Sequence, residues 1–227
     1  MRILAYLLAS SLLVVLTGNS FAQGKPPRSA IPEVSSELLQ LYNRIGKDRK
    51  YEAKILDQVS LRTDFCFSCH GKTGNSERFY IPRLAGQNEG YLLEQLYKFS
   101  VSKRYHYVMV PLASSFEGTD IAGLARFFSK QKNIPRAQYL KKDELNLTLA
   151  KSGKELFQEK CAQCHGKGGK GNQRYARLAG QHPSYIESQL LVFRSRGKAR
   201  PSTPMQNVSR NLTDHQILAL ANYAASL

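Results

Sequence analysis

Cys66-Phe67-Ser68-Cys69-His70 and Cys161-Ala162-Gln163-Cys164-His165 are two copies of the pattern Cys-x-x-Cys-His, and they contain all four cysteines of the 227-residue chain. In each copy, two thiols three residues apart lie on one side of a helical turn. There they can add to the two vinyl groups of one porphyrin, and the histidine that follows can bind its iron. This pattern is the attachment sequence of c-type haem. The chain is therefore predicted to carry two covalently bound haem c groups, held through Cys66, Cys69, Cys161 and Cys164, with His70 and His165 as axial ligands of the irons.

The cysteine pairs have two other known uses, because Cys-x-x-Cys also occurs in redox-active disulfides and as half of a zinc site. Neither use needs a histidine directly after the second cysteine. Here His70 and His165 both occupy that position, and Gly71 and Gly166 follow them. The repetition favours haem and leaves zinc binding and thioredoxin-like exchange as the alternatives.

Two methionines other than the initiator follow these patterns at almost the same distance. Met109 lies 39 residues after His70, and Met205 lies 40 residues after His165. A thioether as the second axial ligand stabilises ferrous iron and raises the reduction potential, which suits a one-electron carrier. We expect Met109 and Met205 to complete the two iron sites. The alternative is that each methionine fills a gap in a core.

The neighbours of these methionines predict local backbone and one competing ligand. Pro111 and Pro204 favour extended backbone over helix at these places. His106, three residues before Met109, is an alternative ligand for the first iron, although a loop histidine near solvent is the commoner case. The other two histidines, His182 and His215, are interpreted as surface or packing residues.

An internal repeat extends well beyond the cysteines. Arg83-Leu84-Ala85-Gly86-Gln87 recurs 94 residues later as Arg177-Leu178-Ala179-Gly180-Gln181. A helical pattern follows each copy, and each unit closes with an apolar stripe typical of an amphipathic helix. The stripes are Ile121, Leu124, Ala125 and Phe127, then Ile217, Leu220, Ala221 and Tyr223, with Thr213 as a predicted helix start. The chain is therefore predicted to be all-α and built from two equivalent units.

We expect five segments along the chain. They are a signal peptide (1–22), an N-terminal extension (23–50), a first domain (51–132), a linker (133–145) and a second domain (146–227). The linker contains Pro135 and several lysines without helical periodicity. A unit of about 90 residues buries only a modest core. Haem is therefore expected to complete each core, and the chain without haem to fold poorly.

The N-terminus predicts export. Arg2 precedes an apolar run from Ile3 to Leu16, and small residues surround a cleavage position after Ala22. Fourteen helical residues would span about 21 Å, short of the roughly 30 Å of a bilayer core. An uncleaved membrane anchor is the alternative. Export to the periplasm agrees with haem attachment, so the cysteines are expected as thioethers despite a compartment that favours disulfides.

The chain is strongly basic, with 33 Lys and Arg against 17 Asp and Glu and a formal charge of +16. Haem propionates would offset part of this charge, and some arginines are expected to pair with them. The remainder would steer the protein toward an acidic redox partner or an anionic membrane surface, with a reach of about 8 Å at physiological salt. Nucleic acid is not expected as a partner. A soluble basic surface without a specific partner is the alternative.

Residues from about 60 to 227 resemble the dihaem cytochrome c4 family. The similarity is most specific in Lys151–Gly166, where Gly153, Phe157 and the cysteines match the first helix of a class I cytochrome c domain, and in the repeated Arg-Leu-Ala-Gly-Gln. The resemblance implies two tandem cytochrome c domains related by pseudo-two-fold symmetry, with haem edges facing across their interface. It also implies the axial pairs His70 with Met109 and His165 with Met205. Similar proteins are periplasmic, often membrane-associated, and pass electrons from quinol-oxidising complexes to oxidases or other reductases.

The first repeat departs from this pattern. Gln58 and Arg62 stand where the second repeat has Gly153 and Phe157, so the packing of the opening helix is expected to differ. The extension has no counterpart in the second repeat. It contains a helical pattern from Ser36 that ends near Gly46, which we expect to supply the missing packing.

These observations favour an electron carrier that is not an enzyme, with each haem ligated by histidine and methionine. The alternative is a dihaem electron-transfer subunit of a larger oxidoreductase, for example a sulfur-compound dehydrogenase. A dihaem peroxidase is less favoured, because it needs one iron with a vacant or labile position.

Overall fold

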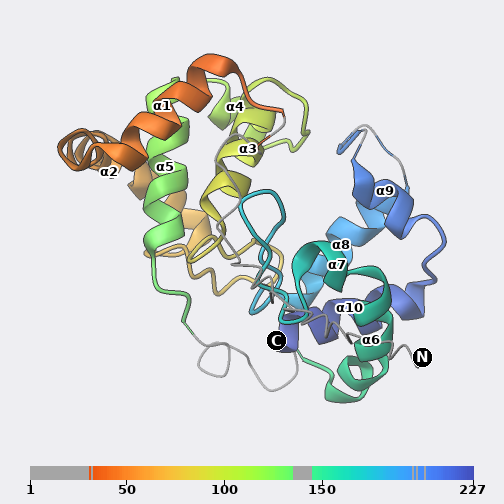
Figure 1. Cartoon of the computed structure of the whole chain (residues 1–227). Helices are drawn as coiled ribbons and strands as arrows, with labels where there is room; N and C mark the ends of the chain where they lie inside the picture. Colours follow the sequence, from red (N-terminus) through yellow and green to blue (C-terminus); the bar gives the residue numbers. More distant parts are fainter. Residues whose placement is uncertain (1–30, 32, 135–144, 196, 198, 202) are drawn as a thin grey trace, which may run out of the picture.

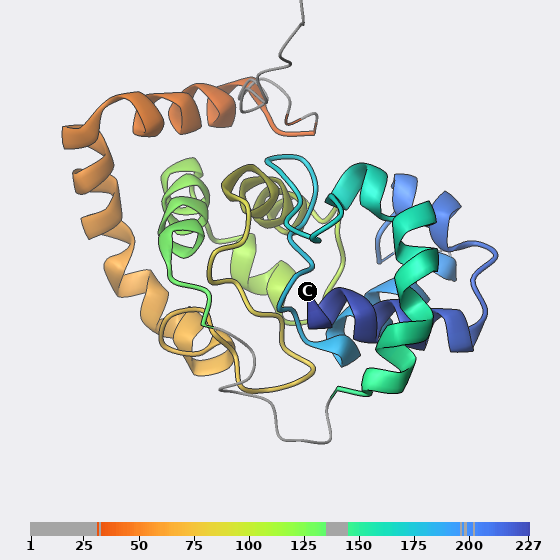
Figure 2. The same cartoon turned by 60° about the horizontal axis from the view of Figure 1, so that its bottom comes forward.

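The computed structural model describes residues 31, 33–134, 145–195, 197, 199–201 and 203–227. Within this part the chain is helical and has no strand, which confirms the predicted all-α class. Two groups of helices lie side by side, one coloured orange to green and one teal to blue (Figures 1 and 2). No helix in the described ranges is both long and apolar enough to cross a membrane. The predicted signal peptide and most of the predicted linker lie outside these ranges.

The two groups follow the sequence repeat. The first contains α1 (Ser36–Lys47), α2 (Arg49–His70), α3 (Glu89–Ser100), α4 (Met109–Ala113) and α5 (Gly118–Lys130). The second contains α6 (Leu147–Lys160), α7 (Ala162–His165), α8 (Pro183–Arg194), α9 (Pro204–Ser209) and α10 (Asp214–Ser226). Helices α3, α4 and α5 are equivalent to α8, α9 and α10, and α1 has no counterpart among the described helices of the second group.

Each group closes around its own hydrophobic core. The predicted stripes of α5 and α10 are buried at Ile121, Leu124, Ile217 and Leu220. The predicted start of α10 is also confirmed, because the Thr213 side chain accepts from the Gln216 N–H at 3.2 Å and Gln216 accepts from the Thr213 N–H at 3.0 Å. The periodicity of the sequence therefore identified both closing helices.

The first and last helices of each domain cross closely, and a glycine permits each crossing. In the second domain, a Cβ at Gly153 of α6 would lie 2.2 Å from the Ala219 carbonyl oxygen of α10. In the first domain the glycine is on the other helix: a Cβ at Gly123 of α5 would lie 2.7 Å from Val59 Cγ1 of α2. Position 58 is a glutamine where the second repeat has a glycine, and Gly123 on the opposite helix provides the space instead. The expectation of altered packing in the first repeat is confirmed, and this exchange is its physical basis.

Helix α1 adds a layer that the second domain lacks. The Ser35 side chain accepts from the Leu38 N–H at 3.3 Å and caps the helix, whose inner face buries Leu38, Tyr42 and Ile45. These residues join the first core, and α1 packs against α2 and α5. The predicted helix in the extension is therefore present, and it supplies packing to the first domain as expected.

The two methionine segments differ from their prediction, because both are short helices rather than extended backbone. Met109 is the first residue of α4, and Met205 is the second residue of α9. Pro204 occupies the first position of α9 and Pro111 the third of α4, where the N–H groups have no helical partner. A proline in the first turn therefore costs no helical hydrogen bond, and the prediction of extended backbone was wrong.

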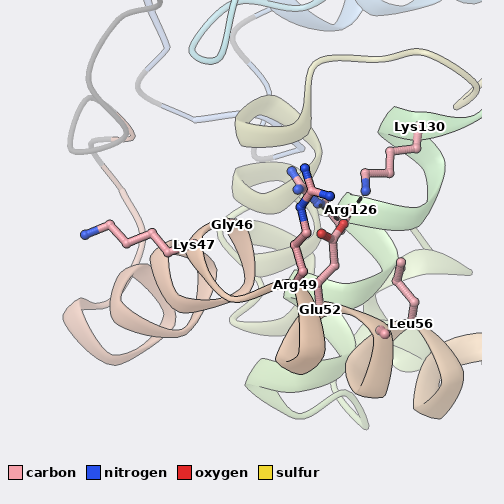
Figure 3. Close-up of a pocket in the computed structure, with 8 residues that line it drawn as sticks. Gly46, Lys47, Arg49, Glu52, Leu56, Arg126 and Lys130 are labelled. Atoms are coloured by element: carbon pink, nitrogen blue, oxygen red, sulfur yellow. Dashed lines mark hydrogen bonds and ion pairs between the residues drawn. The ribbon is translucent and has the colours of Figure 1, made fainter.

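Ion pairs anchor the start of α2 to α5. The Glu52 carboxylate accepts from Arg126 Nε at 2.8 Å and from Lys130 Nζ (Figure 3). Arg126 also contacts Glu89 of α3 at 2.7 Å. Hydrogen bonding to Arg126, with support from Lys130, lowers the pKa of Glu52 to about 2 against the cost of its burial. At neutral pH the carboxylate is therefore charged, and its ion pairs link α2 to α5.

Gly153→Ala should destabilise the second domain, because the new methyl group would collide with backbone at the α6–α10 crossing rather than with a movable side chain. We expect the free energy of unfolding to fall by about 1–3 kcal/mol. The matched control is Gly168→Ala, where a Cβ would meet nothing within 4 Å. Thermal unfolding of the two variants measures the difference, and equal midpoints would contradict the close crossing.

The ion pairs of Glu52 should make the free energy of unfolding depend on pH. The folded state lowers the pKa of this carboxyl from 4.5 to about 2, so the unfolded state takes up the proton first. A contribution on the order of 2–3 kcal/mol is then present above about pH 5 and is lost as the pH falls toward 2. Glu52→Gln should lower the free energy of unfolding at pH 7, and the gap to the unsubstituted protein should narrow toward pH 3. Glu155→Gln, at an exposed position of α6, is the control. If the loss of unfolding free energy in Glu52→Gln did not change with pH, the Glu52 ion pairs would not be its cause.

Candidate functional site

The first Cys-x-x-Cys-His pattern forms the last turns of α2. Cys66 and Cys69 are partly buried, and His70 ends the helix, which stops at Gly71 with a φ of +79°. His70 Nδ1 lies 2.8 Å from the Pro82 carbonyl oxygen. Because a carbonyl oxygen can only accept, Nδ1 donates the hydrogen and Nε2 keeps its lone pair. The ring is thus held in the tautomer that can bind a metal through Nε2.

The second pattern repeats this geometry. Cys161 lies between α6 and α7, and His165 is the last residue of α7 before Gly166, which has a φ of +75°. His165 Nδ1 lies 2.8 Å from the Ala176 carbonyl oxygen. Burial lowers the pKa of His165, as it does for the histidine of the first pattern, which favours the neutral imidazole that metal binding requires.

The cysteines lack the properties that the two alternative readings of the pattern require. None of the four is in a disulfide, and burial raises the pKa of Cys66 and of Cys161 to about 11. A redox-active Cys-x-x-Cys needs a lowered thiol pKa. In the part of the chain that the structure describes, no three His, Cys, Asp or Glu side chains gather as a metal site, so a zinc ion would lack protein ligands. These sites favour covalent attachment over thiol exchange and over zinc.

Each predicted axial methionine lies in the same domain as its predicted histidine. Met109 begins α4, which packs against α3, and Met205 lies in α9, which packs against α8. Met205 is partly buried against the second core. Met109 is partly buried in its own domain. The two helices present the methionines at equivalent positions of the repeat.

His106 contacts the helix that carries Met109. Its Nδ1 accepts from the N–H groups of Val108 at 3.3 Å and Met109 at 3.4 Å, and its ring stacks on Tyr107. The exposed imidazole therefore contacts the backbone at the start of α4, a contact that the sequence did not predict. His182 is buried and bonds the Ser76 carbonyl oxygen of the first domain at 2.9 Å, and His215 is exposed.

The two domains meet through the repeated Arg-Leu-Ala-Gly-Gln segments. Gln181 Oε1 accepts from the Arg83 N–H and its Nε2 donates to the Arg83 carbonyl, both at 2.9 Å. Gln87 makes the mirrored pair with Arg177, at 2.6 and 2.9 Å. In Figure 1 the teal loop that follows α7 lies against the first group of helices at this junction. The repeated motif was visible in the sequence, but its role as an interface was not.

A second pair of equivalent residues, Arg104 and Arg200, lies in the same interface. Arg104 donates to Gln95 of its own domain and to Tyr185 of the other, both at 3.0 Å. Arg200 donates to Gln189 of its own domain at 2.9 Å and to Gln95 of the other at 2.7 Å. No carboxylate in the described residues lies within ion-pair distance of either guanidinium.

These arginines and one buried hydroxyl fit the acidic groups of a haem. Arg200 is only 8% exposed, and its burial, followed by the charge of Arg104, lowers its pKa. The Thr203 hydroxyl, two residues before Met205, is buried without a hydrogen-bond partner. A nearby anion stabilises a buried cation such as Arg200, and a carboxylate can accept from the unpaired Thr203 hydroxyl and matches a guanidinium in shape. The residues present therefore fit both ends of a haem, the iron and the propionates.

Comparisons with known proteins agree with this chemistry. The model of the family "Cytochrome c" matches residues 150–227. The chain is 33% identical over 175 residues to cytochrome c-552 of Acidithiobacillus ferridurans, a match that covers 71% of this chain and 73% of that protein. It is 32% identical over 176 residues to cytochrome c4 of Azotobacter vinelandii, with 71% and 84% covered.

Two further matches are a relative named as an electron acceptor and a solved structure. The chain is 31% identical over 169 residues to a protein of Thiomonas intermedia named thiosulfate dehydrogenase electron acceptor, with 71% and 77% covered. The structure of cytochrome c4 from Acidithiobacillus ferrooxidans superposes with a TM-score of 0.63 at 33% identity, covering 71% of this chain and 98% of that one. On these grounds the chain belongs to the dihaem cytochrome c4 family.

Proposed function

We propose that this protein is a periplasmic electron carrier with two haem c groups, attached through Cys66 with Cys69 and through Cys161 with Cys164. One observation, made twice, supports the proposal most. At the end of each cysteine pair, an imidazole donates Nδ1–H to a backbone carbonyl at 2.8 Å and leaves Nε2 for iron.

The axial pairs in this proposal are His70 with Met109 and His165 with Met205. A haem held by these residues would supply a ferric–ferrous couple that carries one electron. The imidazoles are held by their carbonyl partners, and the methionines by the helices that present them. Two strong protein ligands leave no open position for substrate, so the sites transfer electrons without catalysing a reaction. Arg104 and Arg200 would hold propionates at the domain interface.

We extend the proposal to organisation and partners. The cytochrome c domains would be residues 51–132 and 146–227, joined by 133–145 and preceded by a signal peptide (1–22) and the extension (23–50). The formal charge of +16 supports acidic redox proteins, a membrane oxidase or reductase, or an anionic membrane surface as partners. It does not require nucleic acid, which an exported haem protein rarely meets.

A second candidate function is the electron-accepting subunit of a sulfur-compound dehydrogenase. The relative from Thiomonas intermedia, whose name describes an electron acceptor of thiosulfate dehydrogenase, favours it. Reduction of the purified protein by a thiosulfate dehydrogenase and thiosulfate, without other carriers, would support this role. A general carrier would instead be reduced by quinol-oxidising complexes and not by this enzyme.

Replacing each methionine with leucine tests the ligands, since leucine keeps the volume and removes the sulfur. Met109→Leu and Met205→Leu should each abolish the methionine-to-iron absorption band of one ferric haem and lower one reduction potential by a sizeable part of the roughly 0.8 V that axial ligands tune. Absorption spectra and redox titration of the holoprotein measure both effects.

His106→Ala is the control for the competing ligand, and it should keep both methionine bands. A methionine-to-iron band that keeps its full intensity in Met109→Leu would remove that methionine from the first iron. Binding of carbon monoxide by the unsubstituted protein as isolated would instead favour a peroxidase-type site with an open position.

A further inference from the structure

One peptide group in each domain takes part in two hydrogen bonds of different kinds. The Pro82 carbonyl accepts from His70 Nδ1 at 2.8 Å, and the N–H of the same peptide, that of Arg83, donates to Gln181 Oε1 at 2.9 Å. Gln181 belongs to the other domain. The Pro82–Arg83 peptide therefore connects His70, the predicted iron ligand of the first domain, to Gln181 of the second.

The mirrored connection exists in the opposite direction. The Ala176 carbonyl accepts from His165 Nδ1 at 2.8 Å, and the Arg177 N–H of the same peptide donates to Gln87 Oε1 at 2.6 Å. Gln87 lies in the first domain. Each domain thus contributes one glutamine to the peptide that holds the histidine of the other.

The two glutamines are fixed in place. Both are 7% exposed, and each side-chain amide also donates to the carbonyl of the arginine that it contacts. Each Oε1 accepts a further bond from the next residue of its own chain segment, Asn88 N–H at 2.9 Å and His182 N–H at 3.1 Å. A buried side chain with all these bonds satisfied is a rigid acceptor.

The electronic effect of such a chain has a definite sign. An acceptor at the N–H of a peptide polarises the amide and makes its carbonyl a stronger acceptor. A stronger carbonyl acceptor draws the Nδ1 hydrogen and increases the electron density of the imidazole, which stabilises ferric iron bound at Nε2. Docking of the two domains would therefore lower the reduction potential of each haem.

We propose that Gln181 and Gln87 are positioning residues that tune the iron ligand of the opposite domain through the Pro82–Arg83 and Ala176–Arg177 peptides. This inference rests on the proposed function, because it concerns the haem that each histidine would bind. If so, the domain interface helps to set the reduction potential of each haem, and the repeated glutamine does more than join the domains.

The test is a crossed pattern of reduction potentials in the holoprotein. Gln181→Ala should raise the potential of the haem bound by His70 and leave the other unchanged. Gln87→Ala should raise the potential of the haem bound by His165 alone. Redox titration followed by NMR of the haem methyl groups assigns a potential to each haem.

Asn88→Ala is the matched control. Asn88 Nδ2 also crosses the interface, to the carbonyls of Lys170 at 2.9 Å and Tyr175 at 3.0 Å, but touches neither peptide. This variant should weaken the interface equally and shift neither potential. The two mirrored glutamine variants give independent tests, so one that fails to assemble leaves the other decisive.

Three results would overturn the inference: no shift in either glutamine variant, a shift in the haem of the variant's own domain, or equal shifts of both haems. The last result, especially if Asn88→Ala shared it, would assign the effect to separation of the domains. Failure of the proposed function looks different, since purified protein would then lack the absorption of haem c altogether.

Discussion

The bond between each imidazole Nδ1 and a backbone carbonyl is the constraint on which the rest of this structure depends. It selects the tautomer of His70 and His165, and it fixes the loop that follows each Cys-x-x-Cys-His pattern. The next residue after each carbonyl begins the Arg-Leu-Ala-Gly-Gln segment, which forms the interface. One local hydrogen bond therefore orients an imidazole and positions the surface that joins two domains.

The two domains show one packing problem solved in two ways. A close crossing of the first and last helices needs a residue without a side chain at the contact, because backbone would otherwise collide with a Cβ. The second domain places that glycine on the first helix, at Gly153, and the first domain places it on the last, at Gly123. The first domain also adds α1 and the Glu52–Arg126 ion pair, which hold a longer α2. Its opening helix is thus supported from outside as well as from the core.

The interface combines neutral and charged groups in pseudo-symmetric pairs. The glutamines satisfy backbone groups of the opposite domain, which leaves few buried polar atoms unpaired. Arg200, which is buried, and Arg104, which is partly buried, bring two positive charges to the same surface with only neutral partners among the described residues. Such charges are costly without an anion, so the interface suits a protein whose cofactors supply carboxylates. Under the proposed function, haem propionates would supply that charge and would link cofactor binding to domain association.

The sequence by itself determined the all-α class, the two cysteine patterns, the repeat, and the helices at both closing stripes and in the extension. These follow from local chemistry and periodicity, which need no knowledge of distant contacts. It misjudged the backbone at Met109 and Met205, because a proline in the first turn of a helix looks like a proline that breaks one. Only the tertiary structure decided which carbonyl each histidine meets, where the compensating Gly123 packs, and that Gln87 and Gln181 exchange bonds across the domains. The glutamine bonds join residues 90 or 98 positions apart, and even the histidine bonds span a loop of 11 or 12 residues. Spacing along a chain does not encode how such residues approach each other.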